Sequence, residues 1–432
     1  MRMTYKIIMN KAPIKYLLIL LAGLAFMPAN GQNSGTINLD SCYKLARQYY
    51  PLTRQMGLIE KTRDYNVENA GKGYLPQFSI AGQATYQSAV TSIPFEIPHV
   101  SIPTYSRDQY KIYAEADQTI YDGGTIRNQK DAATADAIVQ KQNLEVNLFA
   151  LNDRINQVYF GILLIDQQLV QNEILQSDIK NSSEQMQARV SNGVALKSGL
   201  EELQAELLQQ EQNQVQLKAS RKAYLDMLGL FIHQNLNESV KLIKPEPVLQ
   251  SDVIKRPELT LYDYQKKSID VQDRMLSTSN MPKFSFFVQG GYGRPGLNML
   301  SNDFSFYYIG GLRLNWQLGG FYSLKNSREL LNINRQTTDL QKETFLYNTN
   351  IVLKQQDGEM AKLQQMITKD DEIIKTRTAV TDDARQKMQN GVMTSHDYLS
   401  ELDLENQARQ NKMLHQVQLI QAQYNYKNTT GN

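Results

Sequence analysis

Few side chains of this chain could carry out chemistry, and their spacing does not assemble them into a reactive site. The four histidines, His99, His233, His396 and His415, are scattered along the sequence, and no phosphate-binding GxxxxGK motif occurs. His396 precedes Asp397, a pair of types that can bind a metal ion or transfer a proton. Neighbouring residues of a helix point in different directions, which favours the solvated start of a helix instead. The sequence therefore predicts no enzyme, no metal site and no cofactor.

Cys42 is the only cysteine, so the chain cannot form an internal disulfide. Its context, "LDSC", allows two interpretations. The thiol is either a lipid attachment point or a small apolar contact on an early helix, "LDSCYKLARQYYP", that ends before Pro51. The charged Asp40 and the long gap after the preceding apolar run favour the helix.

The first 31 residues have the pattern of a secretory signal peptide. Four basic residues precede the apolar run "YLLILLAGLAFM", small residues follow it, and the segment contains no acid. Removing residues 1–31 changes the formal net charge from +2 to −2, which gives no support for nucleic-acid binding. No later apolar run reaches the roughly 20 residues of a membrane helix, which excludes that this chain is itself an inner-membrane pump.

Three landmarks recur in the same order in the two halves of the chain. The phrase "YLPQFSI" returns as "NMPKFSF", "YDGG" returns as "QLGG", and "NGV" occurs twice. Their offsets indicate an internal duplication of about 200 residues. We therefore expect residues 32–432 to form one protomer built from two repeats, at about 38–230 and 253–430.

Each repeat contains two runs in which apolar and polar residues alternate, as in strands with one apolar face. The strands are expected at about 77–88, 109–121, 283–292 and 304–318. The apolar face would carry Ile112, Leu312, Leu314 and Trp316, and the polar face Lys111, Glu115, Asp117, Arg313 and Asn315. A sandwich strand with a buried apolar face is the alternative. Aromatic residues near the strand ends and a length suited to crossing a bilayer favour a lipid-facing barrel with a water-filled lumen.

Four strands cannot close a membrane barrel, because open sheet edges are not tolerated in hydrocarbon. The smallest bacterial barrels have about eight strands, so several copies of the chain must share one barrel. Closure alone does not choose between two, three and four copies. In such a lumen Glu115 and Asp117 would favour cations, partly offset by Lys111 and Arg313.

Long helices are expected at about 125–192, 195–230, 322–390 and 394–428. The first would be uninterrupted and extend roughly 100 Å. Leucines at coiled-coil spacing indicate antiparallel pairs, and each "NGV" turn places a glycine, Gly193 or Gly391, where a helix can end in a left-handed residue. The expected fold class is mainly α with a transmembrane β-barrel portion.

The first repeat contains, in this order, "LPQFSI", "QTIYDGG" and "ARVSNGVALKSGLEELQAE", and the second contains "MPKFSF", "NWQLGG" and "QKMQNGVMTSHDYLSELDLENQ". This succession of motifs resembles the TolC-type outer-membrane efflux proteins. The resemblance covers essentially all of the chain after residue 31. It implies a homotrimer whose twelve strands form one barrel in outer-membrane lipid, continuous with a helical tunnel across the periplasm. It also implies a passive export duct of a tripartite efflux or type I secretion system, with a periplasmic adaptor and a proton-driven or ABC-type inner-membrane pump as partners. The alternative is a periplasmic coiled-coil adaptor or scaffold.

The resemblance also implies a gate at the periplasmic tip. Asp397 follows Gly391 by six residues, as the first gate aspartate of the family follows its tip glycine, and in a trimer three copies would form a carboxylate ring. Asp397 could equally cap the helix that follows "GVMTSH". The second gate aspartate of the family corresponds to Ser400 here, and Gly199 takes the place of Asp397 in the first repeat.

The residues that help to lock the family's closed tip, a tyrosine and an arginine, correspond to Met388 and Met393 in this chain. Much of the usual lock is therefore missing from the sequence. The tip is still expected to constrict the tunnel and to bind the adaptor.

Overall fold

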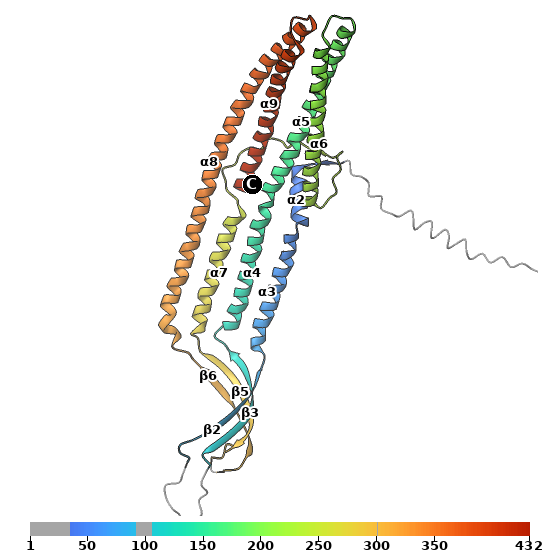
Figure 1. The fold of residues 1–432 in the computed structure, drawn as a ribbon. Helices are drawn as coiled ribbons and strands as arrows, with labels where there is room; N and C mark the ends of the chain where they lie inside the picture. Colours follow the sequence, from blue (N-terminus) through green and yellow to red (C-terminus); the bar gives the residue numbers. More distant parts are fainter. Residues whose placement is uncertain (1–34, 92–105, 300) are drawn as a thin grey trace, which may run out of the picture.

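The computed structural model describes residues 35–91, 106–299 and 301–432. The predicted signal peptide and His99 lie outside these ranges. Within them the chain forms an elongated rod, with a twisted sheet at one end and the tips of two helical hairpins at the other (Figure 1).

Helices make up most of the rod. Their bounds are α2 Leu39–Tyr49, α3 Gln55–Gly71, α4 Thr125–Phe149, α5 Leu151–Ser191, α6 Lys197–Ile232, α7 Pro257–Ser279, α8 Gly320–Gln389 and α9 Ser395–Thr430. Short 3₁₀ turns, Pro51–Arg54 and Lys72–Tyr74, flank α3. In the half of the rod next to the sheet, α4 packs between α3 and α7, and α7 packs against α8. In the other half, α5 packs against α6 and α9, and α9 packs against α8.

The prediction of one uninterrupted helix over 125–192 is wrong, because the structure divides it into α4 and α5 at Ala150. The break falls where the neighbours of the helix change from α3 and α7 to α6 and α9. The end of α9 contacts the chain there, since the Asn428 amide donates hydrogen bonds to Asp153 Oδ1 at 2.5 Å and accepts one from Asn152 at 3.2 Å. The local sequence pattern could not predict this break, because the break depends on which helices pack against the segment.

Four strands form one antiparallel sheet in the order β2-β3-β5-β6: β2 Gln77–Tyr86, β3 Asp108–Tyr121, β5 Lys283–Arg294 and β6 Ser305–Asn315. The prediction that the last strand runs to residue 318 is wrong. Pairing ends at Lys283 and Asn315, because the residue before Lys283 is Pro282, which has no N–H to continue the ladder. None of the helices in the described ranges covers either face of the sheet (Figure 1).

The largest apolar core lies near the middle of the rod, where α2, α4, α5, α6 and α9 meet. Cys42 is fully buried in this core, and burial raises the pKa of its thiol to about 12. The lipid-anchor interpretation is therefore wrong, and the prediction of a small apolar contact on an early helix is confirmed. The Tyr159 hydroxyl fixes a two-stranded parallel sheet, β1 Thr36–Ile37 and β4 Lys241–Leu242, by donating to the carbonyls of Ile37 and Ile243.

The elements follow the same order in both halves of the chain. A helix, two strands, a long helical segment and a returning helix occur first as α3, β2, β3, α4 with α5, and α6, and then as α7, β5, β6, α8 and α9. An internal duplication predicts this order, although the duplication itself stays a prediction. The mainly helical fold with long helices and four antiparallel strands is confirmed.

Candidate functional site

The two hairpin tips end in the same backbone motif. The amide of Val194 donates to the carbonyl of Arg189 at 3.0 Å, and the amide of Val392 donates to the carbonyl of Lys387 at 2.9 Å. Gly193 and Gly391 have φ of 72° and 75°, the left-handed conformation that this helix-ending motif requires. Both turns leave apolar side chains exposed, of which Leu196 is 79% and Val392 is 77% accessible.

An apolar core holds the two hairpins together below the tips. It contains residues of α5, α6, α8 and α9, including Leu175, Ile179, Leu203 and Leu402. Met388 is buried in this core, and Met393 packs against it. The two positions where the family's polar lock is missing therefore contribute apolar contacts between the hairpins instead.

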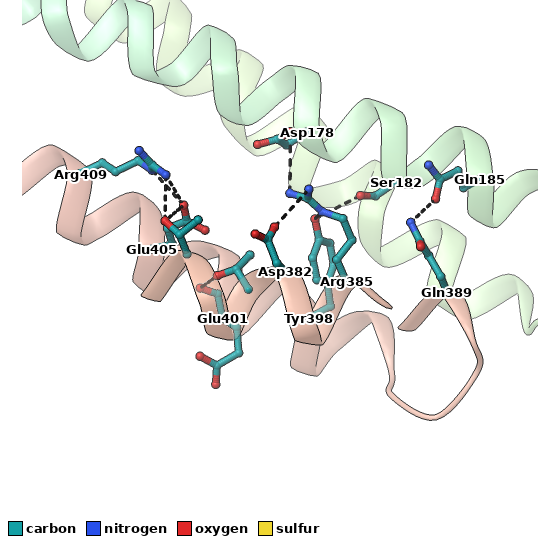
Figure 2. A network of polar contacts seen from close by, with 12 residues as sticks. Asp178, Ser182, Gln185, Asp382, Arg385, Gln389, Tyr398, Glu401, Glu405 and Arg409 are labelled. Carbon is teal, nitrogen blue, oxygen red and sulfur yellow. Dashed lines mark hydrogen bonds and ion pairs between the residues drawn. The ribbon is translucent and has the colours of Figure 1, made fainter. Parts of the chain in front are cut away.

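A polar contact lies inside this apolar core. The fully buried Tyr398 of α9 places its hydroxyl 3.2 Å from the hydroxyl of Ser182 on α5 (Figure 2). Arg385 of α8 donates to the same tyrosine oxygen at 3.4 Å and lies 3.9 Å from Asp178 of α5. Burial acts to lower the pKa of Arg385. The contacts of Arg385 with Tyr398 and Asp178 outweigh burial, so the pKa is raised above its ordinary value.

Two further hydrogen bonds join the tips above Tyr398. Arg189 of α5 donates to the carbonyl of Met388 at 2.5 Å. Gln389 of α8 donates to Gln185 of α5 at 2.6 Å (Figure 2). Because each bond joins one hairpin to the other, the tips move apart only if these contacts break. We call the contacts of Arg385, Tyr398, Ser182 and Asp178 the tip latch.

Asp397 lies outside the tip latch, at the exposed start of α9. Its amide donates to the Thr394 hydroxyl at 3.1 Å, and this hydroxyl donates to the Asp397 carboxylate at 2.7 Å. Thr394 is thus the N-cap residue of α9, and the Asp397 carboxylate supports the start of the helix by accepting the hydrogen bond of this cap. Ser400 is exposed one turn further along. At Gly199, a Cβ would lie 2.6 Å from the Ser395 hydroxyl, so an aspartate there would require this hydroxyl to shift.

A second polar group lies between α8 and α9, further from the tip. Arg409 donates to Glu405 Oε1 at 2.5 Å, and the Thr378 hydroxyl donates to the same carboxylate at 2.8 Å (Figure 2). Burial acts to raise the pKa of Glu405, but the hydrogen bonds from Arg409 and the neighbouring threonines outweigh it and lower the pKa. These contacts fix the register of the α8–α9 pair.

The polar face of the sheet contains the five residues that the alternation predicts. Lys111, Glu115, Asp117, Arg313 and Asn315 share this face in the observed register. Arg313 bridges two of them, with Nη1 2.8 Å from Glu115 Oε1 and 3.0 Å from Asp117 Oδ2.

The opposite face is apolar and exposed. Ile112, Leu312 and Leu314 lie on it, with 57%, 74% and 57% of their surfaces accessible, together with Phe306 and Tyr308. Trp316 is also exposed but lies just beyond β6, and its indole N–H donates to the carbonyl of Asn280 at 3.0 Å. The interpretation of these strands as buried sandwich strands is wrong, because nothing within the described chain covers their apolar face.

The described residues contain no group of three or more histidine, cysteine or acidic side chains placed to hold a metal ion. His396 is exposed, whereas His415 of α9 lies 2.6 Å from Asp370 of α8. None of the helices in the described ranges is both long and apolar enough to cross a membrane.

The described residues define an elongated, mainly helical fold that carries a four-stranded antiparallel sheet with one polar and one apolar face at one end. Residues 43–228 match the family described as outer membrane efflux protein. Its members transport substrates and are not enzymes. A comparison with curated protein sequences gives no match.

Solved structures of several outer membrane proteins share the fold. The outer membrane protein VceC of Vibrio cholerae is 15% identical, with a TM-score of 0.63 over 91% of this chain and 96% of VceC. The CmeC outer membrane channel of Campylobacter jejuni is 12% identical, with a TM-score of 0.62 over 91% of this chain and 85% of CmeC. The MtrE outer membrane channel of Neisseria gonorrhoeae, solved in its open state, is 12% identical, with a TM-score of 0.61 over 91% of this chain and 89% of MtrE.

Sequence reasoning did not find the tip latch or the Asp370–His415 pair. Ser182 and Tyr398 are 216 residues apart, and their proximity depends on how the two hairpins pack. One available signal was the pair of "NGV" turns. Ser182 lies 11 residues before Gly193, and Tyr398 lies seven residues after Gly391. If the two turns lie at the same height along the rod, these two residues therefore lie at similar heights.

Proposed function

We propose that this protein is a passive export duct that crosses the outer membrane as part of a barrel shared between copies of the chain and extends into the periplasm. The observation that carries this proposal is the uncovered sheet, whose apolar face exposes Phe78, Ile80 and Phe306 by 82%, 80% and 86%. In water such a face is strongly unfavourable, whereas lipid suits it and leaves the polar face to line an aqueous pore. A periplasmic adaptor or scaffold has no comparable reason to expose these side chains.

A ring of identical subunits can pair the strand edges that a single copy of the chain leaves open. Strands β2 and β6 are the two unpaired edges of the sheet, and β6 of one copy can pair with β2 of the next. A homotrimer would close twelve strands in this way, in agreement with the family resemblance.

The helices at the two sides of the rod provide matching seams for this ring. Along α8, Ile333, Leu340 and Tyr347 are exposed at intervals of seven residues. On the other side, Leu58 and Tyr65 of α3 have the same spacing, as do Leu208 and Val215 of α6. Apolar residues with heptad spacing are typical of helices that pack against another helix.

We further propose that the hairpin tips dock a periplasmic adaptor, which connects the duct to a proton-driven or ABC-type pump in the inner membrane. The exposed Val194, Leu196 and Val392 provide apolar contacts for an adaptor at the end furthest from the sheet. The duct itself needs no energy source, because the inner-membrane partner supplies it.

The tip latch supports gating at this end. If α8 and α9 swing away from α5 when the duct opens, the Arg385–Asp178 and Tyr398–Ser182 contacts must break. Replacing Arg385 with Met should therefore raise the open population about fivefold, as expected for a loss of about 1 kcal/mol from a partly exposed ion pair. Single-channel recording measures this population, and Lys387→Met, an exposed change on the same helix, is the matched control. An unchanged open population in Arg385→Met would show that the latch does not gate.

The export function is tested by localisation, oligomeric state and channel formation. The full chain, expressed in a Gram-negative cell, should fractionate with the outer membrane, and should migrate as an oligomer in SDS that dissociates on heating. The purified oligomer should form ion channels in a planar bilayer. Recovery of a monomer in the periplasmic fraction would instead support the adaptor or scaffold alternative.

A further inference from the structure

The polar face of the sheet has an uneven distribution of charge. Its charged residues in the described chain are three cations, Lys111, Lys283 and Arg313, and two acids, Glu115 and Asp117. If every group is ionised, each copy contributes a net charge of +1 to this face. The position of each charge matters more than this small total, because the acids and the lysines have different surroundings.

Both acids pair with the same arginine, whose single positive charge offsets one of their two negative charges. The Arg313 guanidinium reaches across β5 from β6, contacting Glu115 at 2.8 Å and Asp117 at 3.0 Å. It lies over the Phe287 ring, with its central carbon 4.4 Å from the ring centroid, and Ser285 donates a further hydrogen bond to Asp117 at 3.1 Å. The side chains of Glu115 and Asp117 are only 17% and 30% exposed, so little of their charge faces the solvent.

The two lysines have no such partner. No acid of the described chain lies within ion-pair distance of Lys111 or Lys283, and their cross-strand neighbours include the uncharged Gln83, Gly293 and Asn315. Lys111 pairs with Gly293, ten residues along β5 from Lys283, so the two cations are separated by about 33 Å along the strand. This distance exceeds the Debye length of about 8 Å at physiological salt, so each acts as an independent centre of positive charge.

We infer that the barrel favours anions, with Lys111 and Lys283 forming two cationic rings in its lumen, and that the exported cargo includes negatively charged molecules. This inference rests on the proposed export function. In a closed barrel each lysine meets its copies at the same height, and rings of cationic side chains select anions. The structure thus reverses the expectation of a cation-favouring lumen, because Arg313 occupies the carboxylates on which that expectation depended.

Reversal potentials across a KCl gradient test the inference. The wild-type oligomer in a planar bilayer should favour Cl⁻ over K⁺, and the Lys111→Gln/Lys283→Gln double variant should shift toward K⁺. Arg313→Gln should shift the same way, since it removes one cation and frees two carboxylates. Gln83→Asn, a neutral change beside Lys111, should leave the reversal potential unchanged.

The tip must be separated from the barrel in this measurement. Repeating each recording with Asp397→Asn removes the contribution of the Asp397 carboxylates at the tip, and the shift caused by the lysine variants should persist. A wild-type preference for K⁺ in this background, or lysine variants with unaltered reversal potential, would overturn the inference while leaving the duct intact. Failure of the wild-type chain to form oligomers and channels would overturn the proposed function, and the inference with it.

Discussion

Leu312 and Leu314 of β6 lie on the apolar face of the sheet, and Asn315 lies on the polar face beside them. If the apolar face contacts lipid, Leu312→Arg should destabilise the assembled barrel by about 2 to 4 kcal/mol when the position is near the bilayer midplane. Asn315→Arg should assemble normally because its side chain remains in water. The measurement is the fraction of heat-sensitive oligomer in outer membranes, and equal losses in both variants would contradict the assignment of the faces.

Glu405 is the residue whose ionisation most clearly stabilises the α8–α9 pair. Its pKa is lower in the folded chain than its ordinary value of 4.5, so the stabilisation is present above pH 4.5 and is lost as the pH falls through the folded pKa. Glu405→Gln should therefore reduce thermal stability at pH 7 and show a smaller further loss on acidification than the wild type. Circular dichroism of the detergent-solubilised protein measures both effects.

Glu211→Gln is the control for this comparison, since Glu211 is exposed on α6. It should keep the acid sensitivity of the wild type. If Glu405→Gln and wild type lose equal stability between pH 7 and pH 4, the Arg409 and Thr378 contacts are not responsible for the pH dependence.

At the scale of the element, variants at the N-terminus of α9 distinguish the two roles considered for Asp397. Thr394→Ala removes the N-cap hydroxyl and should destabilise the helix start by about 1 kcal/mol, measured as faster amide hydrogen exchange over residues 395–400. Asp397→Asn keeps a side-chain oxygen for the Thr394 hydroxyl, so exchange should change little.

The same two variants test a carboxylate ring at the tip. Trivalent cations added from the periplasmic side should block a channel that has three Asp397 carboxylates near its axis, and Asp397→Asn should relieve the block. Equal block in wild type and Asp397→Asn would leave Asp397 only as the partner of the Thr394 cap.

At the scale of the whole molecule, the exposed heptad positions of α8 are expected to be buried in the oligomer. Leu340→Glu should lose the burial of a leucine, about 2 kcal/mol at each interface, and lower the temperature at which the SDS-resistant oligomer dissociates. Asn332→Glu adds the same charge on α8, about 100° around the helix from Ile333, and should dissociate at the wild-type temperature. Equal dissociation temperatures for wild type and Leu340→Glu would place the interface elsewhere.

The sequence by itself determined the features that depend on local periodicity. Alternation over 304–315 fixes which side chains of β6 share a face, since successive residues of a strand point to opposite sides. The glycines of the two "NGV" turns mark the ends of α5 and α8, because a left-handed residue suits glycine. Both features are set within about ten residues of chain, so they could be read before the fold was known.

The tertiary structure decided everything that depends on which distant segments meet. It placed Arg313 between Glu115 and Asp117 across about 200 residues of sequence, joined Tyr398 to Ser182, and interrupted the first long helix at Ala150. Residues of these types have many potential partners along the chain, and only the packing of the helices and the register of the sheet select among them. The sequence thus specified the faces and turns of each element, while the ion pairs on the polar face of the sheet and the contacts that hold the tip together came from their assembly.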